Sequence, residues 1–194
     1  MSTSTELLWA LIGLLLTIGS TFLPASLLLP VWSGAQGLQA YPLGVTYQVG
    51  AVLLVGCLGG KTAAVLSQVA YLLLGLTWYP VFAQGGGWGY LREPSFGYLL
   101  GFVPAAWICG ALAFKSPPRL ESLAFSNLCG LVSVHLVGIA YLVLVYPLGW
   151  LVNPLGLSLP DSLKLYSLAP LPGQFAVACA IAVLAFVLRR LMFY

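Results

Sequence analysis

Apolar residues in this chain form long runs, separated by proline, glycine and isolated charged residues. A helix of about 17 to 25 apolar residues spans a hydrocarbon core of about 30 Å, where no water can satisfy unpaired backbone groups. The sequence therefore predicts an all-α membrane protein, with residues 1–194 forming a single membrane-embedded domain. Six helices are expected, at about residues 7–23, 45–59, 62–78, 96–114, 123–148 and 173–192.

The connections between these helices are of two kinds. Gly59-Gly60-Lys61-Thr62 is long enough only for a tight hairpin, whereas residues 24–44, 79–95 and 149–172 are long and rich in proline and glycine, which oppose regular helix. Irregular backbone at membrane depth has to be buried in protein or line a cavity. We therefore predict three irregular outer loops that form an outward-facing cup. Within the last loop, residues 159–168 favour a short amphipathic helix at the outer surface.

The composition agrees with a membrane location, because 61% of the residues are hydrophobic, 6% are charged and the mean hydropathy is +1.03. Lys and Arg are enriched on the cytoplasmic side of membrane proteins. With six spans, Arg92 and Lys164 fall on one side, and the other side holds Lys61, Lys115, Arg119, Arg189 and Arg190. This distribution predicts a multi-pass protein of the plasma membrane with both termini in the cytoplasm. Residues 1–6 contain no Lys or Arg, so we expect a retained first span rather than a cleaved signal peptide.

Few residues suit other kinds of chemistry. No basic run is present for nucleic acid. The four cysteines lie in apolar segments without a C-x-x-C pair, and the one histidine, His135, has no cysteine or carboxylate beside it, so neither a metal site nor a cofactor is predicted. Residues 56–62 are similar to a phosphate-binding loop, but the glycine spacing is one residue short and the segment joins two spans. Accumulation of a solute would therefore require an ATPase partner or an ion gradient.

Arg92 and Glu93 stand side by side in an otherwise apolar region, after three glycines. Arg92 has two interpretations: a turn residue whose side chain reaches the lipid headgroups, or a cation whose fork holds a carboxylate of a small solute. In the second case, Gly85 to Gly87 would let the backbone approach the ligand. Flat apolar walls would come from Trp78, Tyr79, Trp88 and Tyr90.

Buried amides are the next candidates for ligand contacts, because an unpaired amide in an apolar environment costs a few kcal/mol. Gln48 and Gln84 lie near the predicted cup. Gln68 lies nearer the middle of its helix and either faces the cavity or bridges two helices. His135 either packs with one hydrogen-bonding partner or contacts a ligand.

The sequence LSQVAYLLLGLTWYPVFAQGGGWGYLREPSFGYLLGF, residues 66–102, resembles the core signature of the BioY family. Thr46-Tyr47-Gln48, Tyr146-Pro-Leu-Gly149 and Pro170-Leu-Pro-Gly173 resemble further elements of that family, so that the similarity covers about residues 40–185. The resemblance implies a membrane-embedded binding subunit (S component) for biotin in an energy-coupling-factor (ECF) transporter. Such a subunit captures biotin on the extracytoplasmic side and works with a transmembrane coupling subunit and cytoplasmic ATPase subunits.

One departure from the family pattern concerns the proposed ligand contacts. The family usually follows Pro-Gly with an Asp and, one turn later, a Lys, which are implied to hold polar groups of biotin; this chain has Gln174 and Val177 there. Gln174 can donate to a ureido carbonyl and accept from its N–H. Loss of the Lys places more of the carboxylate binding on Arg92 or on backbone N–H groups. The predicted substrate-binding residues are Gln48, Tyr79, Gln84, Trp88, Arg92, Tyr98, Tyr146 and Gln174, of which Tyr98 and Tyr146 lie in the matched motifs.

Other functions remain open at this point. The departure at Gln174 motivates a different small carboxylated heterocycle as ligand. An intramembrane enzyme would need a nucleophile with a base, for which a Ser or Thr close to His135 in space would be the sign. Asn153-Pro154 is the only feature that suggests a passive channel. In the first helix, Gly13 and Thr17 loosely fit the small-residue pattern by which the resembled family docks on its coupling subunit, and packing within the bundle is the alternative.

Overall fold

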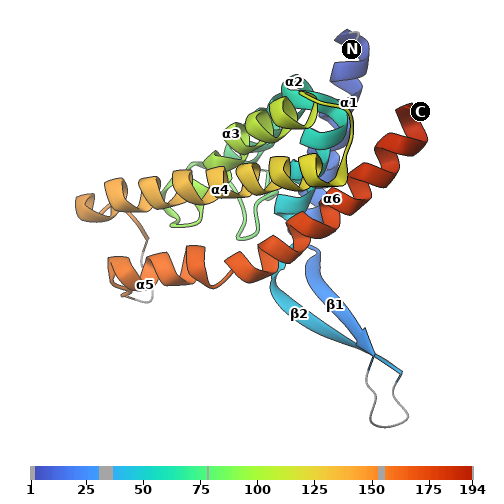
Figure 1. The fold of residues 1–194 in the computed structure, drawn as a ribbon. Helices are drawn as coiled ribbons and strands as arrows, with labels where there is room; N and C mark the ends of the chain where they lie inside the picture. Colours follow the sequence, from blue (N-terminus) through green and yellow to red (C-terminus); the bar gives the residue numbers. More distant parts are fainter. Residues whose placement is uncertain (1–2, 31–36, 78, 153–155, 194) are drawn as a thin grey trace.

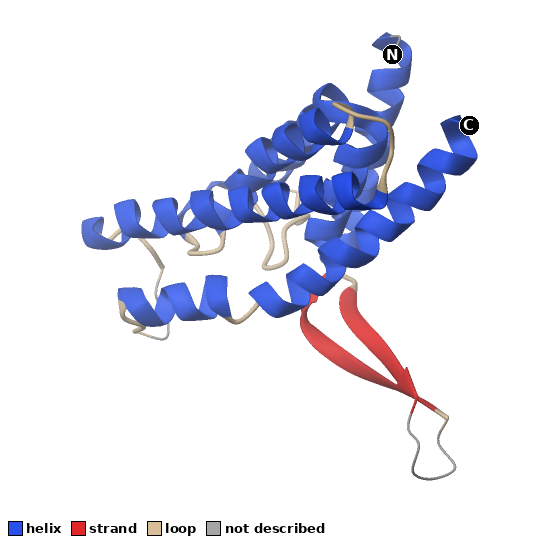
Figure 2. Ribbon diagram, viewed as in Figure 1, coloured by secondary structure: helices blue, strands red, loops and turns tan. Residues whose placement is uncertain are grey.

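The computed structural model of the chain describes residues 3–30, 37–77, 79–152 and 156–193. The elements follow one another along the chain as labelled in Figure 1, and Figure 2 shows that helices dominate. They are α1 Thr3–Thr21, β1 Pro24–Pro30, β2 Leu38–Thr46, α2 Gln48–Leu76, η1 Trp88–Arg92, α3 Phe96–Ala113, α4 Leu120–Val145, η2 Tyr146–Leu148, α5 Leu159–Leu163, η3 Lys164–Leu168 and α6 Leu171–Phe193.

Five helical stretches in this part of the chain are long and apolar enough to cross a membrane, as expected for a multi-pass membrane protein. They overlap the six predicted runs, but Gln48–Leu76 covers both the second and the third, and the last stretch begins at Leu159 rather than at residue 173. The amphipathic helix expected at residues 159–168 is present as α5 followed by the π-helical turn η3.

Helix α2 contains the predicted hairpin between the second and third runs. Its backbone leaves the helical conformation at Gly60, where φ is 77° and ψ is 176°. Nε2 of Gln48 donates to Oη of Tyr71 over 2.8 Å, although the two residues are 23 positions apart. A straight helix with a rise of about 1.5 Å per residue would separate them by about 35 Å. The chain therefore reverses at Gly60, and the two limbs of α2 run antiparallel.

The prediction of an irregular loop at residues 24–44 was wrong in the part that is described, and so was a purely α-helical class. Residues of β1 and β2 pair antiparallel, from Pro24 opposite Thr46 to Pro30 opposite Leu38. The hairpin projects away from the helices (Figures 1 and 2). A two-stranded sheet consists only of edge strands, so proline residues that lack an N–H are tolerated in it. Residues 31–36 lie outside the described part.

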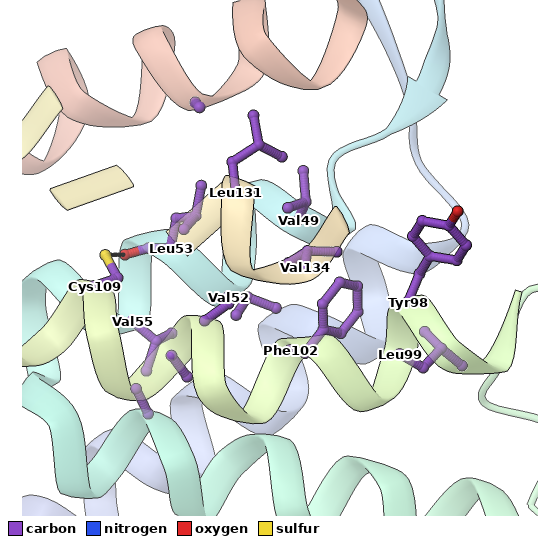
Figure 3. Close-up of a cluster of buried hydrophobic side chains, with 14 of the residues drawn as sticks. Val49, Val52, Leu53, Val55, Tyr98, Leu99, Phe102, Cys109, Leu131 and Val134 are labelled. Atoms are coloured by element: carbon purple, nitrogen blue, oxygen red, sulfur yellow. Dashed lines mark hydrogen bonds between the residues drawn. The ribbon is translucent and has the colours of Figure 1, made fainter. Parts of the chain in front are cut away.

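Glycine allows α3 to approach its neighbours closely. A Cβ atom on Gly97 would lie 2.4 Å from Cβ of Tyr141, and one on Gly101 would lie 2.8 Å from Cα of Val134, both on α4. Such small residues are common where membrane helices contact each other. Apolar side chains of α2, α3 and α4 fill the space between these helices (Figure 3), among them Val52, Leu53, Val55, Leu99, Phe102, Leu131 and Val134.

A buried polar contact within this core joins four helices. Oδ1 of Asn127 accepts from Sγ of Cys57 over 3.1 Å and from Sγ of Cys109 over 3.3 Å, while its Nδ2 donates to the carbonyl of Ala178 over 3.0 Å. Cys57 and Cys109 are fully buried free thiols. These two cysteines therefore pack in the apolar core, and each also donates a hydrogen bond to Asn127.

Helix α1 packs on α2 through the small residues singled out in the sequence. A Cβ on Gly13 would lie 2.8 Å from Cγ1 of Val55, and Thr17 is fully buried. Nε2 of Gln68 donates to Oγ1 of Thr17 over 3.0 Å, so Gln68 bridges two helices. Gly13 and Thr17 thus serve packing within the bundle, which was one of the two alternatives.

Both termini of the chain lie at one end of the bundle (Figure 1), and Glu6 near the N-terminus lines a pocket together with Gly59 and Gly60. A Cβ on Gly110 would lie 2.5 Å from the backbone nitrogen of Lys61, so α3 ends against the turn. Nη1 of Arg189 donates to the carbonyl of Ala113 over 2.6 Å, and its guanidinium lies 4.3 Å from the centre of the Phe114 ring. Lys61 and Arg189, two of the five basic residues predicted for the cytoplasmic side, therefore lie at the same end of the helices.

Candidate functional site

A cavity of about 190 Å³ lies among residues from the ends of the helices that are remote from the Gly60 turn. Gln48 begins α2, Tyr98 lies in the first turn of α3, and Gln174 lies in the first turn of α6. Val134 on α4 and Tyr166 on η3 complete the wall. The lining consists of Gln48, Ala83, Gln84, Tyr90, Ser95, Tyr98, Leu99, Phe102, Val134, Tyr166 and Gln174.

The segment between α2 and α3 covers one side of the cavity. Backbone hydrogen bonds join Phe82 and Gly85 in both directions, at 3.0 and 3.1 Å, which places Ala83 and Gln84 at the tip of a tight turn. The Phe82 ring lies on the backbone of α2, because a Cβ on Gly75 would come within 2.0 Å of it. The loop is therefore anchored on α2, with its tip at the cavity.

The glycine cluster has a structural role that the sequence interpretation missed. Gly85 and Gly87 have φ values of +115° and +88°, which side chains disfavour. A Cβ on Gly86 would lie 2.4 Å from the carbonyl oxygen of Tyr79 and 2.8 Å from that of Gly75. The close approach that these glycines allow is to the protein's own backbone.

Gln48 is held by a buried tyrosine that does not line the cavity. Oη of Tyr71 accepts from Nε2 of Gln48 over 2.8 Å and donates to the carbonyl of Val81 over 3.0 Å. It also lies 3.3 Å from Oγ1 of Thr21. Tyr71 thus connects the cavity, the covering loop and the end of α1.

Gln174 is held in a comparable way by His135, which finds one hydrogen-bonding partner. Nε2 of His135 lies 2.9 Å from Oε1 of Gln174. The ring of Tyr98 meets the His135 ring edge to face, with centroids 5.9 Å apart, and Tyr98 shares a 2.5 Å hydrogen bond with Oγ of Ser167. Within the described residues, no Ser or Thr hydrogen-bonds to His135.

Aromatic side chains form the wall between the loop and α3. The Phe82 ring contacts both the Tyr71 ring, at 5.2 Å, and the Tyr90 ring, at 4.6 Å between centroids, while Tyr90 meets Phe96 at 6.4 Å. Burial raises the pKa of the Tyr90 phenol, and the carboxylate of Glu93 raises it further. Tyr90 therefore stays neutral, and the described lining contains no charged side chain.

Four of the predicted binding residues lie outside the cavity lining in this structure, namely Tyr79, Trp88, Arg92 and Tyr146. Tyr79 and Trp88 are exposed, at 61% and 67% of their surface. Arg92 is exposed as well; its Nε donates to the carbonyl of Trp150 over 3.2 Å, and its own carbonyl accepts from the backbone of Val152 over 2.8 Å.

Tyr146 connects two outer segments, because its hydroxyl donates to the carbonyl of Leu157 over 3.0 Å. Trp78, named as a possible wall, and Asn153-Pro154, the suggested channel feature, lie outside the described residues. Val177 is 2% exposed, and a Cβ on Gly50 would lie 2.8 Å from its Cγ1. At the position where the family carries Lys, the side chain of Val177 therefore packs against α2.

Several residues of the cavity lining were missed from the sequence, among them Phe102 and Tyr166. Phe102 could have been found, because it follows Tyr98 by one helical turn and residues at i and i+4 share a helix face. Tyr166 lies in the predicted amphipathic helix, but no pattern indicated that its side chain would reach the cavity.

In the described part of the chain, no three His, Cys, Asp or Glu residues group in a way that could hold a metal ion.

Comparisons with known proteins identify the family and the fold of this chain. A model of the BioY family matches residues 3–193. A probable biotin transporter BioY from Lysinibacillus sphaericus is 39% identical over 98 residues, which cover 50% of each chain, and one from Bacillus subtilis is 29% identical over 147 residues, covering 74% of each. The crystal structure of the S-component for biotin from an ECF-type ABC transporter matches with a TM-score of 0.70 at 22% identity, covering 98% of this chain and 95% of that one, so the two share a fold.

Proposed function

The chain belongs to the BioY family, and from this premise we propose that it is the membrane-embedded subunit that captures biotin for uptake by an ECF-type transporter. The observation that carries the proposal is the cavity itself, in which three amides, Gln48, Gln84 and Gln174, line a space walled by Tyr90, Tyr98 and Phe102. Aromatic and apolar walls suit the ring system of biotin, and amides suit its ureido group.

The size and charge of the cavity suggest how biotin would lie. Its volume of about 190 Å³ is below the range of about 300 to 1,000 Å³ that is usual for ligand pockets. We propose that it encloses the bicyclic head, while the chain with its carboxylate extends toward the outer loops. Arg92 is the candidate for that carboxylate, because of its three guanidinium nitrogens only Nε hydrogen-bonds to a described residue. Tyr79, Trp88, Gln84 and Tyr146 would contribute from the same loops.

The proposed topology has six spans in a single domain covering residues 1–194, because the two limbs of α2 run in opposite directions. The cup opens to the extracytoplasmic side, and both termini are cytoplasmic in the plasma membrane. This orientation is supported by the five basic residues assigned to the side of the Gly60 turn, against two on the side of the cavity.

The proposal includes a transmembrane coupling subunit and cytoplasmic ATPase subunits as partners. Support comes from the shared fold with the S-component for biotin of an ECF-type transporter. The proposed ligand is bound without a cofactor and without a reaction. A different small carboxylated heterocycle remains the alternative ligand, because Gln174 and Val177 replace the family's Asp and Lys.

Calorimetric titration of the purified protein with biotin and dethiobiotin tests the proposal. We expect biotin to bind at micromolar or lower concentration, and absence of binding at that level would favour the alternative heterocycle. Arg92→Ala is expected to weaken biotin binding by about 1.5 to 3 kcal/mol, the usual worth of a hydrogen bond to a charged group. Lys164→Ala, an equal charge change on the same side, is the control and should leave affinity unchanged. Equal affinities of Arg92→Ala and wild type would remove Arg92 from the site.

A further inference from the structure

Two of the three amides in the cavity lining, Gln48 and Gln174, each have one end held by a buried side chain outside the lining. Tyr71 holds Gln48 and His135 holds Gln174. A primary amide offers a carbonyl acceptor at one end and an NH₂ donor at the other. The end that is held therefore determines which end is left for a guest.

For Gln48, the hydroxyl proton of Tyr71 settles the orientation. That proton is donated to the carbonyl of Val81 over 3.0 Å, a group that can only accept. Oη of Tyr71 therefore acts as an acceptor toward Gln48, and the donor over 2.8 Å is Nε2. No described residue hydrogen-bonds to Oε1 of Gln48, so this residue presents an acceptor to the cavity.

For Gln174, the buried side of His135 settles the orientation. Nδ1 of His135 is buried, and no described residue hydrogen-bonds to it. His135 also lines an apolar groove together with Leu131, Leu171 and Phe175. A buried N–H without a partner is rarer and more costly than a buried acceptor without one, so the proton belongs on Nε2. Nε2–H then donates to Oε1 of Gln174, and Nε2 of Gln174 is left as a donor.

We propose that Tyr71 and His135 are positioning residues that turn the oxygen of Gln48 and the nitrogen of Gln174 toward the cavity, so that the pocket selects a guest with an N–H beside a carbonyl. A cyclic urea matches this pattern, with its N–H donating to Gln48 and its carbonyl accepting from Gln174. The inference deepens the proposed function and rests on it for the identity of the guest as biotin. The preference for an N–H beside a carbonyl does not depend on that identity.

The test compares ligands that differ at the carbonyl. In 2-iminobiotin a protonated imine replaces the ureido carbonyl, so the group offers only N–H donors, as an arginine guanidinium does. The wild-type protein should bind biotin about 10- to 150-fold more tightly than 2-iminobiotin, the range that corresponds to one lost hydrogen bond involving a charged group. Competition against labelled biotin at neutral pH measures this ratio.

Variants of the two positioning residues separate orientation from packing. His135→Leu frees Gln174 to turn its oxygen to the guest, and the preference should fall to about threefold or less. His135→Gln can present either end of its amide to Gln174 and should therefore restore the preference only in part. Tyr71→Phe frees Gln48 and should weaken biotin more than 2-iminobiotin. Matched controls are Ser126→Ala, whose hydroxyl bonds within its own helix, and Tyr141→Phe, whose hydroxyl donates to the Leu91 carbonyl.

Gln174→Glu provides a second arm in case the His135 variants do not fold. A carboxylate offers only acceptors, so this variant should prefer 2-iminobiotin over biotin. The inference is overturned if the wild type does not discriminate between the two ligands. It is equally overturned if each folded His135 or Tyr71 variant weakens the binding of biotin and of 2-iminobiotin by the same factor, and if this factor equals that of the control variants.

A fragment pair distinguishes failure of this inference from failure of the proposed function. Imidazolidin-2-one and its 2-imino analogue carry the same difference without the rest of biotin, and ligand-observed NMR detects weak binding of both. Preference for the urea fragment without biotin binding would sustain the polarity of the pocket and reject biotin as the ligand. Biotin binding without any preference in either pair of ligands would support the proposed function and reject the inferred polarity of the pocket.

Discussion

At the scale of single residues, Gly138 on α4 is important because it has no side chain. Tyr98 lies with its ring over Gly138 on α4, where a Cβ would come within 2.4 Å of the ring atoms. The same ring lines the cavity and contacts the ring of His135. The glycine therefore allows α3 and α4 to approach each other and also sets the position of a cavity wall.

Gly138→Ala is expected to destabilise the protein by about 1 to 3 kcal/mol, because the added methyl group overpacks the contact with Tyr98. Gly19→Ala on α1 is the matched control, since no atom lies within 4 Å of its Cβ position, and it should be neutral or slightly stabilising. Thermal unfolding of both variants in detergent measures the difference. Equal melting temperatures for the two variants would contradict the proposed close packing.

Among the elements, the α2 hairpin has the largest effect on the site. Reversal at Gly60 brings Tyr71 back beside Gln48, so that the first residue of α2 and a residue of its second limb meet at the cavity. The second limb also carries the covering loop, because Gly87 donates its N–H to the carbonyl of Gly75 over 2.7 Å. A change at the turn should therefore affect the geometry of the distant cavity as well as stability.

Gly60→Ala is expected to cost about 1 to 3 kcal/mol, because φ of 77° with ψ of 176° is a conformation that is essentially restricted to glycine. Gly149→Asn is the control: at φ of 61° and ψ of 20°, Gly149 has a left-handed conformation that Asn also adopts. Thermal melts should show a clear loss for the first variant and little change for the second. A stable Gly60→Ala protein would argue against the hairpin.

The molecule as a whole has two chemically different ends. The end with the Gly60 turn and both termini is close to Arg189 and Lys61, whereas the other end holds the uncharged cavity and the exposed loop with Trp88. Antiparallel limbs in α2 produce this arrangement, because each limb returns the chain to the opposite end. The proposed orientation assigns the first end to the cytoplasm.

Labelling with a membrane-impermeant maleimide tests that orientation. Trp88→Cys should react in intact cells, and Lys115→Cys should react only after permeabilisation. Cys57 and Cys109 are buried and can stay, whereas Cys129 and Cys179 are replaced by alanine in the background. That background without an added cysteine is the control for labelling of the remaining thiols. The reverse pattern would place the cavity on the cytoplasmic side.

Much of the fold follows from local composition. Apolar runs located the long helices, the glycines at 59 and 60 located the hairpin, and the pattern at residues 159–168 located a short helix. Prolines at residues 24–44 were misleading, because their effect depends on whether a strand has neighbours on both sides. Whether a strand has neighbours on both sides is a property of the whole sheet and cannot be deduced from the segment alone.

For the candidate site, too, the sequence indicated some features and could not indicate others. Spacing and motif were enough to select Gln48, Gln84, Tyr98 and Gln174, all of which line one cavity. The sequence could not indicate which end of each amide faces that cavity, because Tyr71 is 23 positions from Gln48 and His135 is 39 from Gln174. Amide orientation is set by hydrogen bonds between residues that only folding brings together, whereas membrane insertion is set by the apolar character of each segment taken alone.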